Sequence, residues 1–227
     1  HAHADHLSGA QTLKAEFPEA KVGISKRITQ VQQIFHAALN LGDEVATDGS
    51  QFDLLLTEGD HLPLGDLSIG VLHTPGHTPA CSTYLIGDAA FVGDTLFMPD
   101  YGTARADFPG GDAATLYRSI GKILALPPHT RLFVGHDYLP ATRTDYRWET
   151  TVAEEAAANV HVHAGVSEQS FVAMREARDR TLAAPTLILP SLQVNIRAGA
   201  LPPASPGGTV FLKLPVTFAS GTRPAAA

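Results

Sequence analysis

The amino-acid sequence predicts a mixed α/β fold in which polar side chains follow the ends of strands. Short apolar runs such as 67–73 and 131–134 are bounded by turn residues and alternate with segments of helical periodicity. The pair Gly65-Asp66 separates two such runs, as in a hairpin. Strands alternate with helices and titratable residues recur at strand ends, so the periodicity alone predicts only a mixed α/β fold.

The first half of the chain predicts two helices and several strands. Apolar residues at helical spacing run from Leu7 to Phe17, with Asp5 or Ser8 as the candidate N-cap and Pro18 at the end. A second helical stripe runs from Ile28 to Leu39. We expect strands at 21–25, 62–64, 67–73, 82–86 and 89–92.

The second half predicts three more helices. Asp112 caps the first, which carries Leu116 and Ile120 on its apolar face. Segments 150–159 and 167–182 are expected to be the last helices, and the many Arg and Glu residues of 167–182 favour a solvated face. Segment 210–214 is the candidate for an edge strand. We expect one domain over residues 1–218 and a disordered tail over 219–227.

Composition excludes several classes of function. A chain of 227 residues with 44% hydrophobic and 17% charged residues is typical of one globular domain. The net charge of −7 argues against nucleic acid or an anionic membrane surface as a partner, and no window is long and apolar enough for a membrane span. The single cysteine excludes an internal disulfide and suits a reducing cytoplasm, which is the localisation we expect.

The segment His1-Ala2-His3-Ala4-Asp5-His6 places three imidazoles and a carboxylate together. Burying these groups without partners would cost several kcal/mol. Three more polar residues follow predicted strands or turns further along the chain: His77, Asp94 and His136. Neutral imidazole and carboxylate are common ligands of zinc and ferrous iron, so the sequence predicts a metal site.

This order of motifs resembles the signature of the metallo-β-lactamase superfamily over almost the whole chain. The resemblance implies the αββα four-layer sandwich of that superfamily. In the family, the HxHxDH loop follows a run of N-terminal strands. Here a candidate ligand is residue 1 and no initiator Met precedes it, so we expect a chain that lacks those strands.

Four segments resemble the bacterial, β-lactamase-like branch of the persulfide dioxygenases, also called sulfur dioxygenases: 74–84, 102–108, 136–138 and 190–199. The resemblance implies one Fe(2+) per chain, bound by His1, His77 and Asp94. It implies oxidation of glutathione persulfide, or a related low-molecular-weight persulfide, with O2 and water to sulfite and thiol. In place of an Asn-Pro-Arg that helps the mitochondrial type to hold glutathione, this chain has Asn159-Val160-His161.

The resemblance also implies roles around the iron. Residues expected to orient the ligands and bound water are His3, Asp5, His6 and His136. The expected catalytic residues are His136, Tyr138, Arg105 and Asp107. Tyr138 is a candidate substrate contact, and Arg105 with Asp107 is either a pair near the metal loop or a structural salt bridge. Cys81 is either a small core residue or part of a sulfur pocket.

A hydrolase of the glyoxalase II type is the alternative, because all seven ligands of its two zinc ions are present. The first ion would use His1, His3, His77 and Asp94, and the second Asp5, His6, His136 and the shared Asp94. A metal-bound hydroxide would then attack a thioester. The longer, basic C-terminal substrate domain of that family is not recognisable here. For both functions we expect a small-molecule partner, with a homodimer as the candidate assembly.

Overall fold

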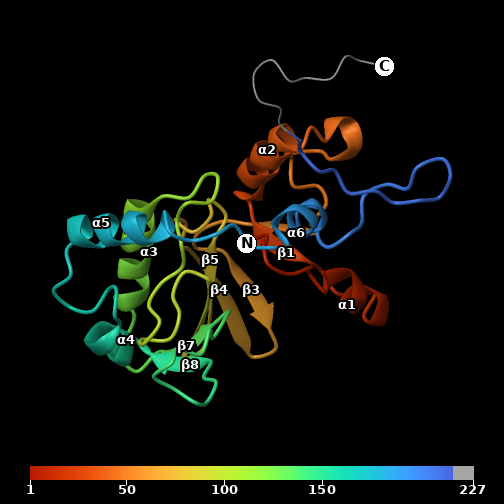
Figure 1. Ribbon diagram of the computed structural model, residues 1–227. Coiled ribbons are helices and arrows are strands. Elements are labelled where there is room, and N and C mark those ends of the chain that lie inside the picture. Colours follow the sequence, from red (N-terminus) through yellow and green to blue (C-terminus); the bar gives the residue numbers. More distant parts are fainter. Residues whose placement is uncertain (217–227) are drawn as a thin grey trace, which may run out of the picture.

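The computed structural model describes residues 1–216, in which the strands form two sheets (Figure 1). The larger sheet has six strands in the order β3-β4-β5-β6-β7-β8, and the smaller one pairs β1 with β2 in parallel. The strands are β1 (Gly23–Ser25), β2 (Leu54–Leu56), β3 (His61–Leu64), β4 (Leu67–His73), β5 (Ser82–Ile86), β6 (Ala89–Gly93), β7 (Arg131–Val134) and β8 (Glu149–Thr151).

The helices of the described chain lie on both sides of these sheets (Figure 1). Asp112 caps α3 as predicted, because its side chain accepts a hydrogen bond from the Thr115 amide. Thr151 and Glu154 form a capping box at the start of α4. The helices are α1 (Ala10–Glu16), α2 (Ile28–Ala38), the short 3-10 helix η1 (Gly42–Glu44), α3 (Ala113–Leu124), α4 (Val152–Ala158), α5 (Glu168–Asp179) and α6 (Ile188–Asn195).

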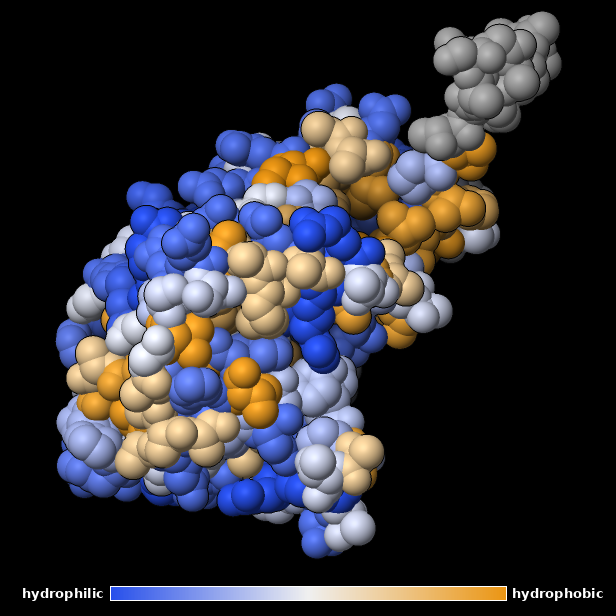
Figure 2. Space-filling view, turned by 60° about the vertical axis from the view of Figure 1, so that its left-hand side comes forward, coloured by the Kyte–Doolittle hydropathy of each residue, from blue (hydrophilic) through white to orange (hydrophobic). Residues whose placement is uncertain are grey.

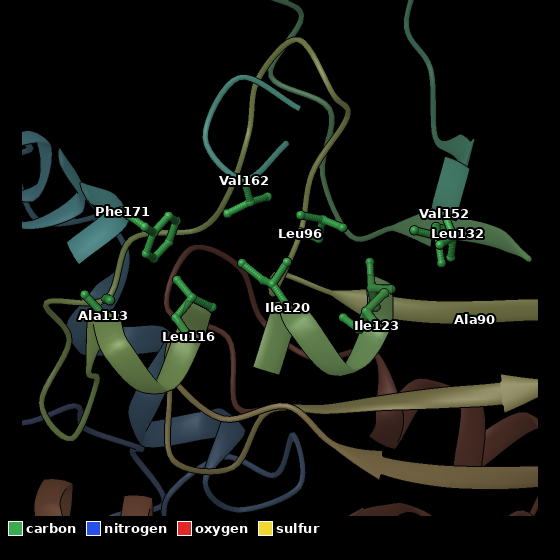
Figure 3. Packing of buried hydrophobic residues seen from close by; sticks show 12 residues of the cluster. Ala90, Leu96, Ala113, Leu116, Ile120, Ile123, Leu132, Val152, Val162 and Phe171 are labelled. Carbon is green, nitrogen blue, oxygen red and sulfur yellow. The ribbon is translucent and has the colours of Figure 1, made fainter. Parts of the chain in front are cut away.

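One hydrophobic core joins the six-stranded sheet to α3, α4 and α5. Figure 3 shows Leu116, Ile120 and Ile123 of α3 packed among residues of the sheet and of the neighbouring helices. All three are at most 1% exposed. Fully burying such side chains stabilises the fold by about 1.5–3 kcal/mol each, so this core fixes the sheet that carries the candidate site.

A second core joins α2, β1 and the C-terminal end of α6. Its buried residues include Ile24 of β1, Ile28 and Val31 of α2, and Ile196 just after α6. Ala2 also belongs to this core, with 6% of its surface exposed. Ala2 therefore anchors the N-terminal segment to this core, with His1 and His3 on either side of it.

This arrangement has the mixed helix and strand content that the sequence predicted. The second sheet of the sandwich has only two strands in the described residues. It faces β4 of the larger sheet, because the Ser25 hydroxyl lies 3.4 Å from Nε2 of His73.

Of the predictions about the C-terminal helices, one was confirmed in part and one was wrong. Glu176, Arg178 and Arg180 are exposed, as expected for a solvated face, but Arg175 and Asp179 of α5 are buried and pair with each other. The helix at 150–159 and that at 167–182 are not the last, since α6 follows them. Pro190 lies in the first turn of α6, where its missing N–H is tolerated.

Predictions at the two ends of the chain also need correction. The helix expected over 7–17 is shorter, none of its residues is buried, and Gly9 is its N-cap, although the Ser8 hydroxyl accepts a bond from the Ala10 amide. The expected edge strand at 210–214 reduces to one bridge between Ala204 and Val210. Its apolar side chains are exposed, and Figure 2 shows hydrophobic residues gathered there. The tail predicted at 219–227 lies outside the described residues.

Within residues 1–216, no helix combines the length and the apolar character that crossing a membrane requires.

Candidate metal centre and its cavity

Strand topology places three of the predicted ligands at one edge of the large sheet. Strands β4 and β6 run in the same direction because each is antiparallel to β5, and β7 is parallel to β6. Their C-terminal ends therefore lie at the same edge. His77 follows β4, Asp94 follows β6 and His136 follows β7.

Two glycines permit close approaches at this edge. A Cβ on Gly135 would lie 2.6 Å from Oδ1 of Asp94, so only glycine leaves room for the carboxylate there. A Cβ on Gly76 would lie 2.3 Å from the backbone of Leu116, so glycine lets the His77 loop rest directly on α3. The Gly135 amide also donates to the Gly93 carbonyl at 3.0 Å, which joins the β6 and β7 ends.

The N-terminal histidine loop reaches this edge from the second core. Ala2 is buried in that core, and the side chain of Asn195 binds the loop further along. Its Nδ2 donates to the carbonyls of His3 and His6 at 2.9 and 2.8 Å. Its Oδ1 accepts from the Ser8 amide at 2.8 Å. One buried amide thus fixes the loop's backbone at three points.

Asp94 is the centre of a first group of donors. Its Oδ2 lies 3.1 Å from Nε2 of His1, 3.6 Å from Nδ1 of His3 and 3.8 Å from Nε2 of His77. The donor atoms of His1, His3 and Asp94 all lie within 4.8 Å of one another. This group therefore contains the three predicted iron ligands. It also contains His3, which is as near to Asp94 as His77 is, although the single-iron prediction did not count His3 as a ligand.

A second group lies on the other side of the same carboxylate. Oδ1 of Asp94 is 3.5 Å from Nε2 of His136, which is itself 3.3 Å from Oδ2 of Asp5. The donor atoms of His3, Asp5, His6 and His136 also lie within 4.8 Å of one another. All seven histidine and aspartate residues singled out in the sequence therefore converge, in two adjoining groups.

These residues fit a bound cation. Nε2 of His1, Nδ1 of His3 and Oδ1 of Asp94 are buried and have no hydrogen-bond partner among the described residues. Burial opposes ionisation of Asp94, but the neighbouring histidines outweigh it and hold its pKa well below the usual range. A buried carboxylate facing several imidazoles requires a positive partner, and a divalent metal ion supplies one.

His77 is oriented by its second ring nitrogen. Its Nδ1 lies 2.8 Å from the carbonyl of Arg105, so Nδ1 carries the proton and Nε2 faces Asp94. Burial, together with the nearby charge of His1, lowers the pKa of His77 to about 4. The ring is therefore neutral at physiological pH, which is the form that ligates metals.

A cavity of about 300 Å³ opens on this centre. His77, Asp94 and Asp5 are among its lining residues. Tyr138 lines the wall and stacks on Tyr101, with ring centroids 4.8 Å apart. Burial and the charges of Asp94 and Asp5 raise the pKa of Tyr138 to about 12, so its phenol stays protonated and can donate a hydrogen bond.

Arg105 and Asp107 form the ion pair that the sequence suggested, with Nε of Arg105 2.6 Å from Oδ1 of Asp107. Arg105 lines the cavity, and its guanidinium lies over the Phe108 ring at 5.2 Å from the centroid. Phe108 in turn contacts His77 edge-on, with centroids 5.1 Å apart. The pair therefore supports the metal centre through Phe108 and through the Arg105 carbonyl. Cys81 is buried at 2% exposure and is absent from the cavity lining.

Sequence reasoning missed three contributors. The aromatic residues Phe97 and Tyr101 line the cavity, but they stand between strands without any motif. Arg143 forms hydrogen bonds to Asp137 with both Nη atoms, at 2.8 and 2.6 Å, and so fixes the backbone beside His136 and Tyr138. Arg143 lies in an irregular loop, where periodicity gives no signal. Only a basic residue near the acidic His136-Asp137 pair could have suggested it.

Comparison with known proteins agrees with this geometry. The sequence pattern described as "Metallo-beta-lactamase superfamily" matches residues 1–136. A Burkholderia pseudomallei protein named "Probable metallo-hydrolase" is 55% identical over 226 residues, which is 95% of this chain and 76% of that protein. "Glyoxylase B2" of Dictyostelium discoideum is 49% identical over 219 residues, 96% of this chain and 75% of that protein.

More distant matches carry another name. "Persulfide dioxygenase ETHE1, mitochondrial" of Mus musculus is 31% identical over 208 residues, 90% of this chain and 69% of that protein. The crystal structure of ETHE1 from Myxococcus xanthus has a TM-score of 0.69 and 32% identity, and the match covers 88% of this chain and 75% of that one. With its fold, its converging ligands and a family match over more than half its length, this chain belongs to the metallo-β-lactamase superfamily.

Proposed function

We propose that this protein is an iron-dependent persulfide dioxygenase. It oxidises glutathione persulfide, or a related low-molecular-weight persulfide, to sulfite and thiol, and one O2 and one water supply the three oxygens of sulfite. The cavity is the main support, because it is lined by His77 and Asp94, two of the three candidate iron ligands. The similarity to persulfide dioxygenase ETHE1 over 90% of the chain supports the same reaction.

In this proposal His1, His77 and Asp94 hold one Fe(2+). Ferrous iron bound by two imidazoles and a carboxylate supplies open coordination positions and redox chemistry with oxygen. His3, Asp5, His6 and His136 orient the ligands and nearby water. The protonated Tyr138 phenol donates a hydrogen bond to the substrate, and the aromatic wall of Phe97 and Tyr101 excludes bulk water.

A dinuclear zinc hydrolase of the glyoxalase II type is the second candidate. The observation in its favour is the second donor group, His3, Asp5, His6 and His136, which adjoins the first through the two oxygens of Asp94. The names of the more similar relatives, "Probable metallo-hydrolase" and "Glyoxylase B2", also point to hydrolysis. Both candidates require small-molecule substrates, and the acidic net charge of −7 suits neither nucleic acid nor an anionic membrane.

Metal content and oxygen uptake separate the two candidates. The protein is purified anaerobically, its metals are counted, and glutathione persulfide is added with an oxygen electrode and a sulfite assay. The proposal expects about one iron per chain and stoichiometric sulfite. Rapid hydrolysis of S-lactoylglutathione by a form with two zinc ions, without oxygen uptake, would refute it.

Two variants test the ligand roles. Asp94→Ala should abolish iron binding, because Asp94 lies between both donor groups. His136→Ala should retain most of the iron and lower turnover, because His136 is 3.5 Å from the far oxygen of Asp94 and outside the first group. Loss of one of two metal ions in His136→Ala would instead favour the dinuclear hydrolase.

A further inference from the structure

Three arginines line the cavity beside the metal centre: Arg105, Arg175 and Arg178. Arg105 precedes α3, and the other two lie on α5. Three guanidinium groups on one cavity are unexpected in a chain of net charge −7, and their availability to a ligand depends on whether each is paired with a carboxylate of the protein.

Two of these charges are neutralised within the protein. Arg105 donates to both oxygens of Asp107, at 2.6 and 2.8 Å. Arg175, which is 1% exposed, pairs with Asp179 at 2.7 Å and donates to the Thr103 carbonyl at 3.2 Å. Asp179 also accepts from the Ala106 amide at 2.9 Å, so this pair fixes the cavity wall. Neither arginine has its charge available for a ligand.

Arg178 differs from the other two. It lies three residues after Arg175, so both side chains project from neighbouring positions on α5 toward the cavity. Arg178 is exposed, and no carboxylate in residues 1–216 forms an ion pair with it. Its charge still acts on the protein interior, because burial and the charges of Arg175 and Arg178 lower the pKa of His161 to about 4.

The rest of the wall suits a ligand that extends from the metal centre to Arg178. Leu182 and Pro185 line the cavity together with Arg178, and so do the aromatic residues Phe97, Tyr101 and Tyr138. A volume of about 300 Å³ is at the small end of the range for ligand sites, which suits a small thiol derivative.

From this arrangement we infer that Arg178 binds a carboxylate of the substrate, so that the enzyme selects persulfides that carry an acidic group remote from the sulfur. This inference rests on the proposed function, whose substrate class it narrows. The planar guanidinium can donate two parallel hydrogen bonds to a carboxylate, whereas a lysine ammonium acts as a point charge. Arg178 is thus assigned a role in specificity, separate from the metal ligands.

The test measures binding, by titration calorimetry, to the metal-loaded full chain. The probes are S-methylglutathione and its diethyl ester, which differ only in their carboxylates. The variants are Arg178→Gln and Arg178→Lys, with Arg180→Gln as the matched control. Arg180 is also exposed and lies next to the end of α5, but it is absent from the lining of this cavity.

Arg178→Gln should weaken the binding of S-methylglutathione about tenfold relative to the ester, because a hydrogen bond to a charged group is lost. Arg178→Lys should recover part of this discrimination, and Arg180→Gln should leave it unchanged. Equal weakening of both probes in Arg178→Gln, the same loss of discrimination in Arg180→Gln, or no binding of S-methylglutathione to the wild type would overturn the inference.

The outcome is independent of the reaction. Binding of S-methylglutathione involves no oxygen chemistry. If Arg178→Gln changes the preference for S-methylglutathione over its ester, but glutathione persulfide causes no oxygen uptake, then the role of Arg178 is supported and the dioxygenase function is refuted. If oxygen uptake and sulfite formation are observed, but Arg178→Gln does not change the preference between the two probes, then the dioxygenase function is supported and the role of Arg178 is refuted.

Discussion

Asn195 should control both the stability of the histidine loop and its affinity for metal. Its side chain makes three hydrogen bonds to the backbone of residues 3–8, at 2.8 to 2.9 Å, and it is 4% exposed. The loop carries four of the seven candidate ligands but contributes only Ala2 to a hydrophobic core. Its backbone geometry therefore depends strongly on this one amide.

The substitution Asn195→Asp isolates the two donated bonds. Aspartate keeps an oxygen for the Ser8 amide, but it replaces Nδ2 with a second oxygen that faces the carbonyls of His3 and His6. Two hydrogen bonds are lost at about 1 kcal/mol each, and the carbonyls are left facing a carboxylate, which adds about 1–2 kcal/mol. We expect the free energy of unfolding to fall by about 3–4 kcal/mol, with weaker metal binding.

Urea denaturation and metal titration of the apo protein measure these two quantities. Asn40→Asp is the matched control, because Asn40 is exposed and makes no side-chain hydrogen bond in the described structure. An Asn195→Asp variant with the stability and metal affinity of the control would show that the loop's geometry does not depend on the amide.

Three further outcomes are expected. Gly135→Ala should lower metal content, because its Cβ would lie 2.6 Å from Asp94 Oδ1 and 3.1 Å from the backbone of Gly93. Gly121→Ala, where the space is open, is the control in metal analysis. Burial raises the pKa of Glu155 from 4.5 to about 8, so its contribution to stability is present below pH 4.5 and is lost as pH rises toward 8. Urea denaturation at a series of pH values should show a loss of up to about 5 kcal/mol over this range, and the Glu155→Gln variant should not show this loss. Arg175→Met should cost about 3–5 kcal/mol in the same assay, because it leaves the buried carboxylate of Asp179 without its ion-pair partner.

Local signals predicted much of the fold. The hairpin around Gly65-Asp66 and the amphipathic α3 were predicted because turn chemistry and apolar periodicity act over a few residues. Helix α6 was missed because Ser191 to Asn195 are buried on all sides, which removes the alternation between apolar and polar faces. Strands β2 and β8 have only three residues each, too few for a periodic pattern.

The candidate site was predictable in its ligands but not in its supports. His77, Asp94 and His136 follow strand ends and have distinctive residue types, so the sequence singled them out, and the common direction of β4, β6 and β7 in the structure explains why they converge. Arg175 and Asp179 resemble any i, i+4 surface pair in sequence, and only tertiary packing shows that they are buried against segment 103–106. The ligand roles themselves stay predictions until metal is measured.

The metal centre lies where the two hydrophobic cores meet, which explains why its residues come from distant parts of the chain. Ala2 belongs to the core of α2 and β1, and it is flanked by His1 and His3. Asp94 follows β6, whose Ala90 and Val92 belong to the core under α3. Because His1 and Asp94 approach within 3.1 Å, a cation that binds both would join the two cores. A ligand that binds only the folded chain adds about 2.7 kcal/mol of stability at a hundredfold excess over its Kd. Metal binding and the docking of the N-terminal loop are therefore coupled, whichever reaction the centre performs.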